Sequence, residues 1–184
     1  MVDFDSLTDE ELVEHVRSKD QEVYAELVKR YETRLLRYAQ SFVHDTHAAQ
    51  DVVQNSFIKA FINLNGFNTK KKFSSWIYRI VHNESLNEIK KNRKEFSLDN
   101  MLETALPINE ENMEDIFDFQ LSREKITSCI DKLPLNYRSP IILHFIEDRS
   151  YEEISDILRI PMGTVGTRIK RGKRLLYQLC NNEQ

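Results

Sequence analysis

Long segments in which apolar residues recur every three or four positions constrain the fold of this chain more than any other feature. Only four glycines and four prolines occur among its 184 residues. A spacing of three and four residues matches one face of a helix, and glycine and proline are the residues that most often end one. We therefore expect an all-α protein without strands, built from small helical domains.

Four segments in the first half predict one helix bundle. The first, "SLTDEELVEHVRSKD", opens with a Ser or Thr cap and acidic first-turn residues, which the helix dipole favours. Each of the other three carries an apolar stripe. The stripes consist of Val23, Tyr24, Leu27, Tyr31, Leu35, Tyr38 and Phe42; of Val52, Val53, Phe57, Phe61 and Leu64; and of Phe73, Trp76, Ile77, Ile80 and Ile89. We expect these stripes, Trp76 included, to form the core.

Charge is divided sharply along the chain, although the formal net charge is only −4. Residues 59–94 hold nine Lys or Arg and two acids, residues 95–118 hold eight acids and no base, and residues 168–174 hold five cations. The acidic segment has weak periodicity and a proline, which is typical of a flexible linker. We therefore predict an N-terminal domain over 1–94, an acidic linker over 95–119 and a C-terminal domain over 120–184.

Several classes of protein are disfavoured by what the sequence lacks. No apolar run approaches the ~20 residues of a membrane span, and the acidic N-terminus is unlike a signal peptide, so we expect a cytoplasmic protein. Cys129 and Cys180 lack metal-ligand spacing, and in a reducing compartment they are expected to be unpaired thiols. His44 and His47 form an H-x-x-H at a helix junction, where solvated histidines are commoner than zinc ligands. Without a phosphate loop or a catalytic motif, we expect no enzyme, no metal and no cofactor.

The stretch "RSYEEISDILRIPMGTVGTRIKRGKRLL", residues 149–176, predicts a helix-turn-helix. Ser150 is a suitable N-cap for the first helix, and Pro161 marks the start of the second. At ~100° per residue, one set of residues falls on the side of the second helix that faces its own domain, and hydroxyls and cations gather on the opposite side. The inward set is Val165, Ile169, Gly172 and Leu176, and the outward set is Thr164, Thr167, Lys170, Arg171 and Arg174, with Arg168 and Lys173 on the flanks.

Such a helix suits the major groove of DNA, with phosphates held at its margins. The alternative is an ordinary amphipathic helix with a solvated basic face. The turn chemistry and the segregation of the two faces together favour DNA binding.

Three segments carry a family resemblance. "LPLNYRSPIILHFIEDRSYEEISDILRIPMGTVGTRIKRGKRLL" resembles the promoter-reading C-terminal domain of bacterial sigma factors, and "DVVQNSF" and "FSSWIYRIVHNESLN" resemble their N-terminal domain. Their order, spacing and length are similar to the extracytoplasmic-function group, over about residues 8–92 and 120–178. Arg159 stands at a turn where the family often has Gly. An Arg there either costs about 1 kcal/mol of backbone strain or indicates a slightly different turn. Gly166 replaces a larger, often basic residue, which leaves open which bases are read.

The resemblance implies a protein that binds core RNA polymerase, directs it to a promoter and helps to open the duplex. It assigns polymerase binding to the polar residues Asp51, Gln54, Asn55 and Lys59. An anti-sigma protein is a usual partner in the family, although no residue here demonstrates one. The resemblance also places the acidic linker in the polymerase channel that later receives RNA, where it acts either by its charge or as a simple tether.

The loop "NGFNTKKKF" and the helix after it resemble the family's element for the downstream promoter motif. Reading a melted strand requires an aromatic surface, amides for base edges and cations for phosphates. The resemblance assigns the surroundings of a flipped base to Phe67, Tyr78 and Asn83, and Asn87 lies one helical turn further. The cations that can hold phosphates are Lys70, Lys71, Lys72 and Arg79. Trp76 lies on the apolar stripe of this helix, which favours a place in the core over a role as a wedge that melts DNA.

Two other functions share part of this pattern. A one-component transcription regulator has a similar helix-turn-helix but needs a ligand or receiver domain in place of the basic, aromatic N-terminal loop. An adaptor that docks on polymerase does not need two basic surfaces. Promoter-specific initiation with purified core polymerase separates a sigma factor from both.

Overall fold

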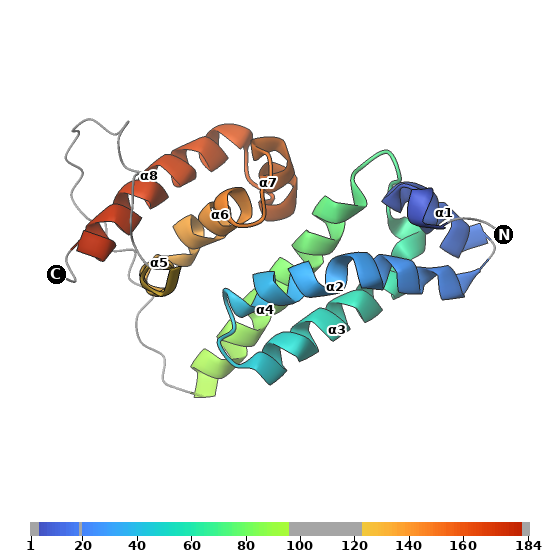
Figure 1. Cartoon of the computed structure of the whole chain (residues 1–184), viewed down its shortest axis with the longest axis horizontal. Helices are drawn as coiled ribbons and strands as arrows, with labels where there is room; N and C mark the ends of the chain where they lie inside the picture. Colours follow the sequence, from blue (N-terminus) through green and yellow to red (C-terminus); the bar gives the residue numbers. More distant parts are fainter. Residues whose placement is uncertain (1–3, 19, 96–122, 182–184) are drawn as a thin grey trace.

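A computed structural model describes residues 4–18, 20–95 and 123–181, which fold into helices joined by short turns (Figure 1). No strand occurs among these residues, as the all-α prediction requires. Residues 96–122 lie outside the described part, so the predictions about the acidic linker remain predictions. The described helices form an N-terminal and a C-terminal group.

The N-terminal group contains four α-helices: α1 (Asp9–Ser18), α2 (Tyr24–Gln40), α3 (Thr46–Ile62) and α4 (Phe73–Glu95). Short 3-10 turns occur at Phe4–Ser6, Gln21–Val23 and Leu64–Gly66. Helices α2, α3 and α4 pack against one another, and α1 lies at one end of them (Figure 1).

Side-chain caps define where two of these helices begin. The Thr8 hydroxyl accepts a hydrogen bond from the Glu11 amide at 3.3 Å, and the Glu11 carboxylate accepts one from the Thr8 amide at 2.8 Å. This reciprocal cap confirms the predicted start of the first helix. Asp45 caps α3 by accepting from the Ala48 amide at 2.7 Å.

The predicted apolar stripes form the bundle core, with one exception. Leu27, Leu35 and Tyr38 of α2 and Phe73 and Ile77 of α4 are fully buried.

Trp76 is half-buried and packs against this core, with its ring centroid 4.9 Å from that of Phe67. The exception is Phe61, which is 38% exposed. It lies on the flank of the buried face of α3, with its ring centroid 5.0 Å from that of Tyr24.

The C-terminal group contains α5 (Arg123–Asp131), α6 (Leu135–Phe145), α7 (Tyr151–Leu158) and α8 (Met162–Asn181). Helix α8 packs along α6 and also contacts α5 and α7. Helix α7 lies beside α4 of the N-terminal group, so the two groups touch (Figure 1).

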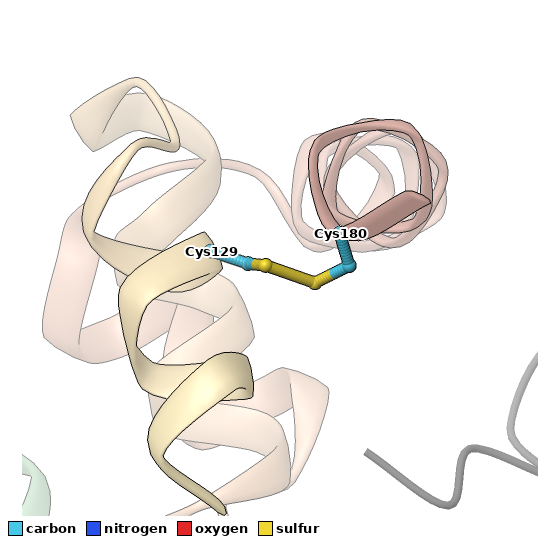
Figure 2. Close-up of a disulfide and its surroundings, with 2 residues drawn as sticks. All are labelled: Cys129 and Cys180. Atoms are coloured by element: carbon cyan, nitrogen blue, oxygen red, sulfur yellow. A yellow bond between two sulfur atoms is a disulfide. The ribbon is translucent and has the colours of Figure 1, made fainter. Parts of the chain in front are cut away.

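A disulfide joins Cys129 of α5 to Cys180 in the last turn of α8, with their Cα atoms 5.6 Å apart (Figure 2). The expectation of two unpaired thiols is therefore wrong. The two cysteines are 51 residues apart in the sequence, and only the packing of α5 on α8 brings them together. Sequence spacing carries no information about such a distance.

Candidate nucleic-acid interface

Local hydrogen bonds build the helix-turn-helix of α7 and α8. The Ser150 hydroxyl accepts from the Glu153 amide at 3.2 Å, and the Glu153 carboxylate accepts from the Ser150 amide at 3.0 Å. Helix α7 ends at Arg159, whose φ of 56° and ψ of 43° are left-handed. Pro161 then precedes α8, which begins at Met162. The predicted cap and second helix start are confirmed, and of the two alternatives for Arg159 the left-handed conformation is the one observed.

One face of α8 is fixed against α6 by very close packing. Val165 and Ile169 are buried, at 0% and 3% exposure. A Cβ atom at Gly172 would lie 2.9 Å from Cγ1 of Ile141, a distance that real Cβ atoms essentially never show. Glycine at this position therefore lets α6 and α8 approach, and it leaves the opposite face of α8 pointing outward.

The outward face of α8 presents the predicted hydroxyls and cations to different extents. Thr167, Lys170 and Arg171 are exposed, whereas Thr164, Arg168 and Arg174 are half-buried. The Thr167 hydroxyl donates to the Gly163 carbonyl at 2.9 Å, which leaves its oxygen as an acceptor.

A small groove beside this face contains two residues that the sequence did not suggest. Asn136 and Tyr137, in the first turn of α6, line it together with Thr164, Arg168 and Arg171 of α8. Their position two and three residues after Pro134, at a helix start, was the signal that the sequence offered.

The residues predicted to hold a melted strand do not form an open pocket in this arrangement. Tyr78 is fully buried and Phe67 is 6% exposed, while Asn83 and Asn87 are exposed. Five positions along a helix correspond to about 140° of rotation, so Tyr78 and Asn83 lie on different faces of α4. Their joint role with a flipped base stays a prediction.

Tyr78 packs against Tyr38 of the bundle core, with ring centroids 5.2 Å apart, and residues of the turn between α6 and α7 also contact it. Its hydroxyl donates to the Glu147 carboxylate at 2.6 Å, and the same carboxylate accepts from Nε of Arg37 at 2.9 Å. The Arg149 guanidinium lies over the Tyr78 ring, 4.3 Å from its centroid. Burial, followed by the hydrogen bond to Glu147, raises the pKa of Tyr78 to about 12, so the phenol is a neutral donor.

Helix α7 also pairs its acids with the predicted phosphate-binding cations. Nζ of Lys71 lies 3.1 Å from the Asp156 carboxylate, and Nζ of Lys72 lies 3.1 Å from the Glu153 carboxylate. Arg79 lies 3.8 Å from the Asp156 carboxylate. Burial acts to raise the pKa of Glu153, but hydrogen bonds from Ser150 and Lys72 lower it below its ordinary value.

Burial of the Arg79 guanidinium, followed by the positive charge of the nearby Arg159, lowers the pKa of Arg79. Lys70, the fourth predicted cation, is exposed. Three of the four predicted cations therefore form ion pairs with acids of α7.

The residues assigned to polymerase binding lie on the exposed side of α3. Asp51, Gln54 and Asn55 are exposed, and Lys59 is exposed while forming an ion pair with Glu84 of α4 at 2.6 Å.

The same side of α3 carries two apolar residues that the sequence interpretation missed. Ile58 and Ile62 are 51% and 70% exposed, and they continue the stripe of Asp51 and Asn55. The signal was present, because Ile58 and Ile62 lie opposite the buried Val53 on a helical projection.

His44 and His47 are exposed on either side of Asp45, whose carboxylate is used to cap α3. Among the described residues no cluster of three or more possible metal ligands occurs. In the same part of the chain no helix is long and apolar enough to cross a bilayer.

Both groups of helices are similar to known proteins. Residues 27–95 match the family model of sigma-70 region 2, and residues 123–176 match that of sigma-70 region 4. The chain is 33% identical to the ECF RNA polymerase sigma factor SigW of Bacillus subtilis (strain 168), over 89% of this chain and 92% of the relative. It is also 33% identical to the ECF RNA polymerase sigma-E factor of Salmonella typhimurium (strain LT2), over 94% of each.

Two solved structures share the fold at lower sequence identity. CnrH, in complex with the cytosolic domain of CnrY, superposes with a TM-score of 0.73 at 23% identity, over 96% of this chain and 99% of CnrH. The sigma factor RpoE of Bartonella quintana, in complex with the anti-sigma factor NepR, gives a TM-score of 0.66 at 20% identity, over 88% and 98% of the two chains.

Proposed function

Since the chain belongs to the extracytoplasmic-function sigma factors of the sigma-70 family, we propose that it binds core RNA polymerase and directs promoter-specific initiation. In this proposal, α8 reads duplex DNA, and the loop and helix α4 read one melted strand. The observation that carries it is the helix-turn-helix whose second helix buries Val165 and Ile169 while exposing Thr167, Lys170 and Arg171. Membership of the family favours this function over a one-component regulator or an adaptor.

Exposure along α8 supports a division between base contacts and phosphate contacts. Lys170 and Arg171 are exposed on the outward face, where an arginine can donate two hydrogen bonds to a guanine edge. Arg174 is half-buried one turn further along, which suits a phosphate at the groove margin. Asn136 and Tyr137 border the same surface from α6 and add polar groups for the DNA backbone.

Two arginine variants test this division. With holoenzyme and a promoter selected from random DNA, Arg171→Ala should cost about 1–3 kcal/mol of specific binding and relax the preference at one base position. Arg174→Ala is the matched control on the same helix, and it should weaken all sequences alike. An equal loss on selected and random DNA for Arg171→Ala would remove the base-reading assignment.

For the melted strand, Asn83 offers the most direct test because it is exposed and lies outside the core. Asn83→Ala should leave duplex binding by α8 intact and reduce open-complex formation, since only an unpaired base meets this residue. Permanganate reactivity of promoter thymines measures the opening. Wild-type reactivity in the variant would contradict single-strand readout by Asn83.

For the polymerase contact, we propose that Ile58 and Ile62 supply an apolar centre and that Asp51 and Gln54 supply its polar rim. Exposed apolar residues bordered by polar ones are typical of protein interfaces. Ile58→Ala should weaken holoenzyme assembly by roughly tenfold, because a central apolar anchor contributes about 1–2 kcal/mol.

Stability should change by less than about 0.5 kcal/mol, because Ile58 is half exposed. Asp51→Ala with Gln54→Ala should also lower the affinity, whereas Gln50→Ala, an exposed position on the flank of α3, is the control. Assembly of the Ile58 variant at wild-type concentrations would place the polymerase contact elsewhere.

An anti-sigma protein is a further proposed partner. The solved structures of CnrH and of RpoE contain CnrY and NepR respectively. Copurification of this chain from its own cells, with and without the addition of core polymerase, tests whether a second protein competes for it.

A further inference from the structure

Resting on the proposed readout of a melted strand, we propose that the free protein is closed upon itself. In the closed arrangement, the segment from Glu147 to Asp156 occupies the place of the single strand on the N-terminal bundle. The C-terminal domain is thus a competitor of the melted strand for the same site. The charges, the stacking surface and the polarity of the contact each support this inference.

The first support is the match of charges. Glu153 and Asp156 lie on α7 at positions that face the cations of the N-terminal loop and α4. Their carboxylates reach Lys72 and Lys71, each at 3.1 Å, and Asp156 also approaches Arg79 at 3.8 Å. Phosphates of a bound strand require the same cations. The α7 acids and a DNA strand therefore cannot hold them at the same time.

The second support is the stacking surface. A base stacks on an aromatic ring or on a planar guanidinium, and the Arg149 guanidinium lies 4.3 Å from the centroid of the Tyr78 ring. The hydroxyl of Tyr78 is held by Glu147 at 2.6 Å, and the ring is fully buried. The segment thus imitates a nucleotide strand, with one planar group on the aromatic ring and anions on the neighbouring cations. Tyr78 becomes accessible to a base only after this segment leaves.

The third support is that the contact is polar and open to exchange. The side chains of Lys71 and Lys72 are 56% and 69% exposed, so their ion pairs are screened by water and salt and are individually weak. Glu147 is different, because its side chain is 1% exposed and depends on Arg37 and Tyr78 for partners. Polar contacts between domains of this kind separate readily. Binding to polymerase then has only to shift an existing equilibrium.

The test uses the full chain with Glu153→Gln and Asp156→Asn together. Gln at position 153 can still accept from the Ser150 amide, so the cap of α7 is retained. The control, Glu22→Gln with Glu152→Gln, removes two exposed acids outside the contact and gives the same change of net charge. Small-angle scattering and hydrogen exchange of α4 report opening, and circular dichroism checks the helical content.

Binding is measured with a dye-labelled DNA single strand of about 12 nucleotides, a length within the usual range of site sizes for single-strand binding. The opened variant should bind it at least about fivefold more tightly than the wild type, because the competent fraction of the protein rises. The control should remain closed and gain much less. In holoenzyme, the wild type and the variant should open promoters equally, since polymerase separates the domains in both.

Three outcomes would overturn the inference. One is a wild-type chain that already binds the strand as tightly as the opened variant. Another is a scattering profile in which both the double variant and Glu147→Gln remain as compact as the wild type, which would show that these carboxylates do not hold the domains together.

The third outcome is an opened variant that fails to bind the strand, and Asn83→Ala in holoenzyme then identifies the cause. If that variant opens promoters normally, the proposed single-strand readout itself is wrong. If it is defective, the readout stands and only the competition is wrong.

Discussion

Two glycines on α8 offer a comparison in which one substitution should destabilise the protein and the other should stabilise it. Ala is the better helix former by about 1 kcal/mol at either position, so this gain cancels in the comparison. At Gly166 an added Cβ meets Cε2 of Tyr151 at 3.5 Å, an ordinary contact. At Gly172 it meets Cγ1 of Ile141 at 2.9 Å and Cβ of Tyr137 at 3.4 Å.

Ile141 is 2% exposed and cannot move aside, so overpacking at Gly172 should cost about 1–3 kcal/mol. Gly166→Ala should therefore raise the free energy of unfolding by up to about 1 kcal/mol, and Gly172→Ala should lower it by up to about 2 kcal/mol. Because a protein of two domains need not unfold in one step, the assay is native-state hydrogen exchange of amides in α6 and α8. Equal protection in the two variants would refute the close approach of α6 and α8.

Three further predictions concern stability. Arg159→Gly should stabilise the C-terminal domain by about 1 kcal/mol, since the left-handed φ of 56° strains a side chain but not glycine; Arg159→Ala is the control, and a lower melting temperature for Gly would contradict this. Reduction of Cys129–Cys180, which closes a separation of 51 residues, should cost up to about 4 kcal/mol, and melting with and without reductant should differ in the wild type but not in Cys180→Ser. Burial lowers the pKa of His82 from 6.5 to about 4, so as the pH falls the unfolded chain takes up the proton first. The free energy of unfolding should therefore fall by about 1.4 kcal/mol for each pH unit as the pH is lowered from 6.5 to 4, and His82→Phe should show a flatter pH profile in urea unfolding.

Features set by local chemistry could be predicted from the sequence. The cap at Ser150 depends on residues three positions apart, and the inward face of α8 follows from a period of 3.6. The left-handed residue at Arg159 was one of two expected alternatives, because the family that the chain resembles often has Gly, which tolerates a positive φ, at this turn. These elements need no information from distant parts of the chain.

Features set by contact between distant segments could not be predicted. Tyr78 and Glu147 are 69 positions apart, and nothing in the periodicity of α4 indicates that a turn of the other domain covers it. The disulfide between α5 and α8 is of the same kind. Ile58 and Ile62 differ, since a helical projection alone places them away from the core. The family resemblance directed the interpretation to their polar neighbours instead.

The carboxylate of Glu153 serves a local contact and a distant one at the same time. One oxygen accepts from the Ser150 amide at 3.0 Å, and the other lies 3.1 Å from Lys72 and 3.8 Å from Arg149. Natural variation at this position is therefore constrained twice. Among relatives, exchange of Glu for Gln that is independent of position 72 would indicate selection for the helix cap alone. Correlated loss of the acid at 153 and the base at 72 would instead record selection on the contact between domains.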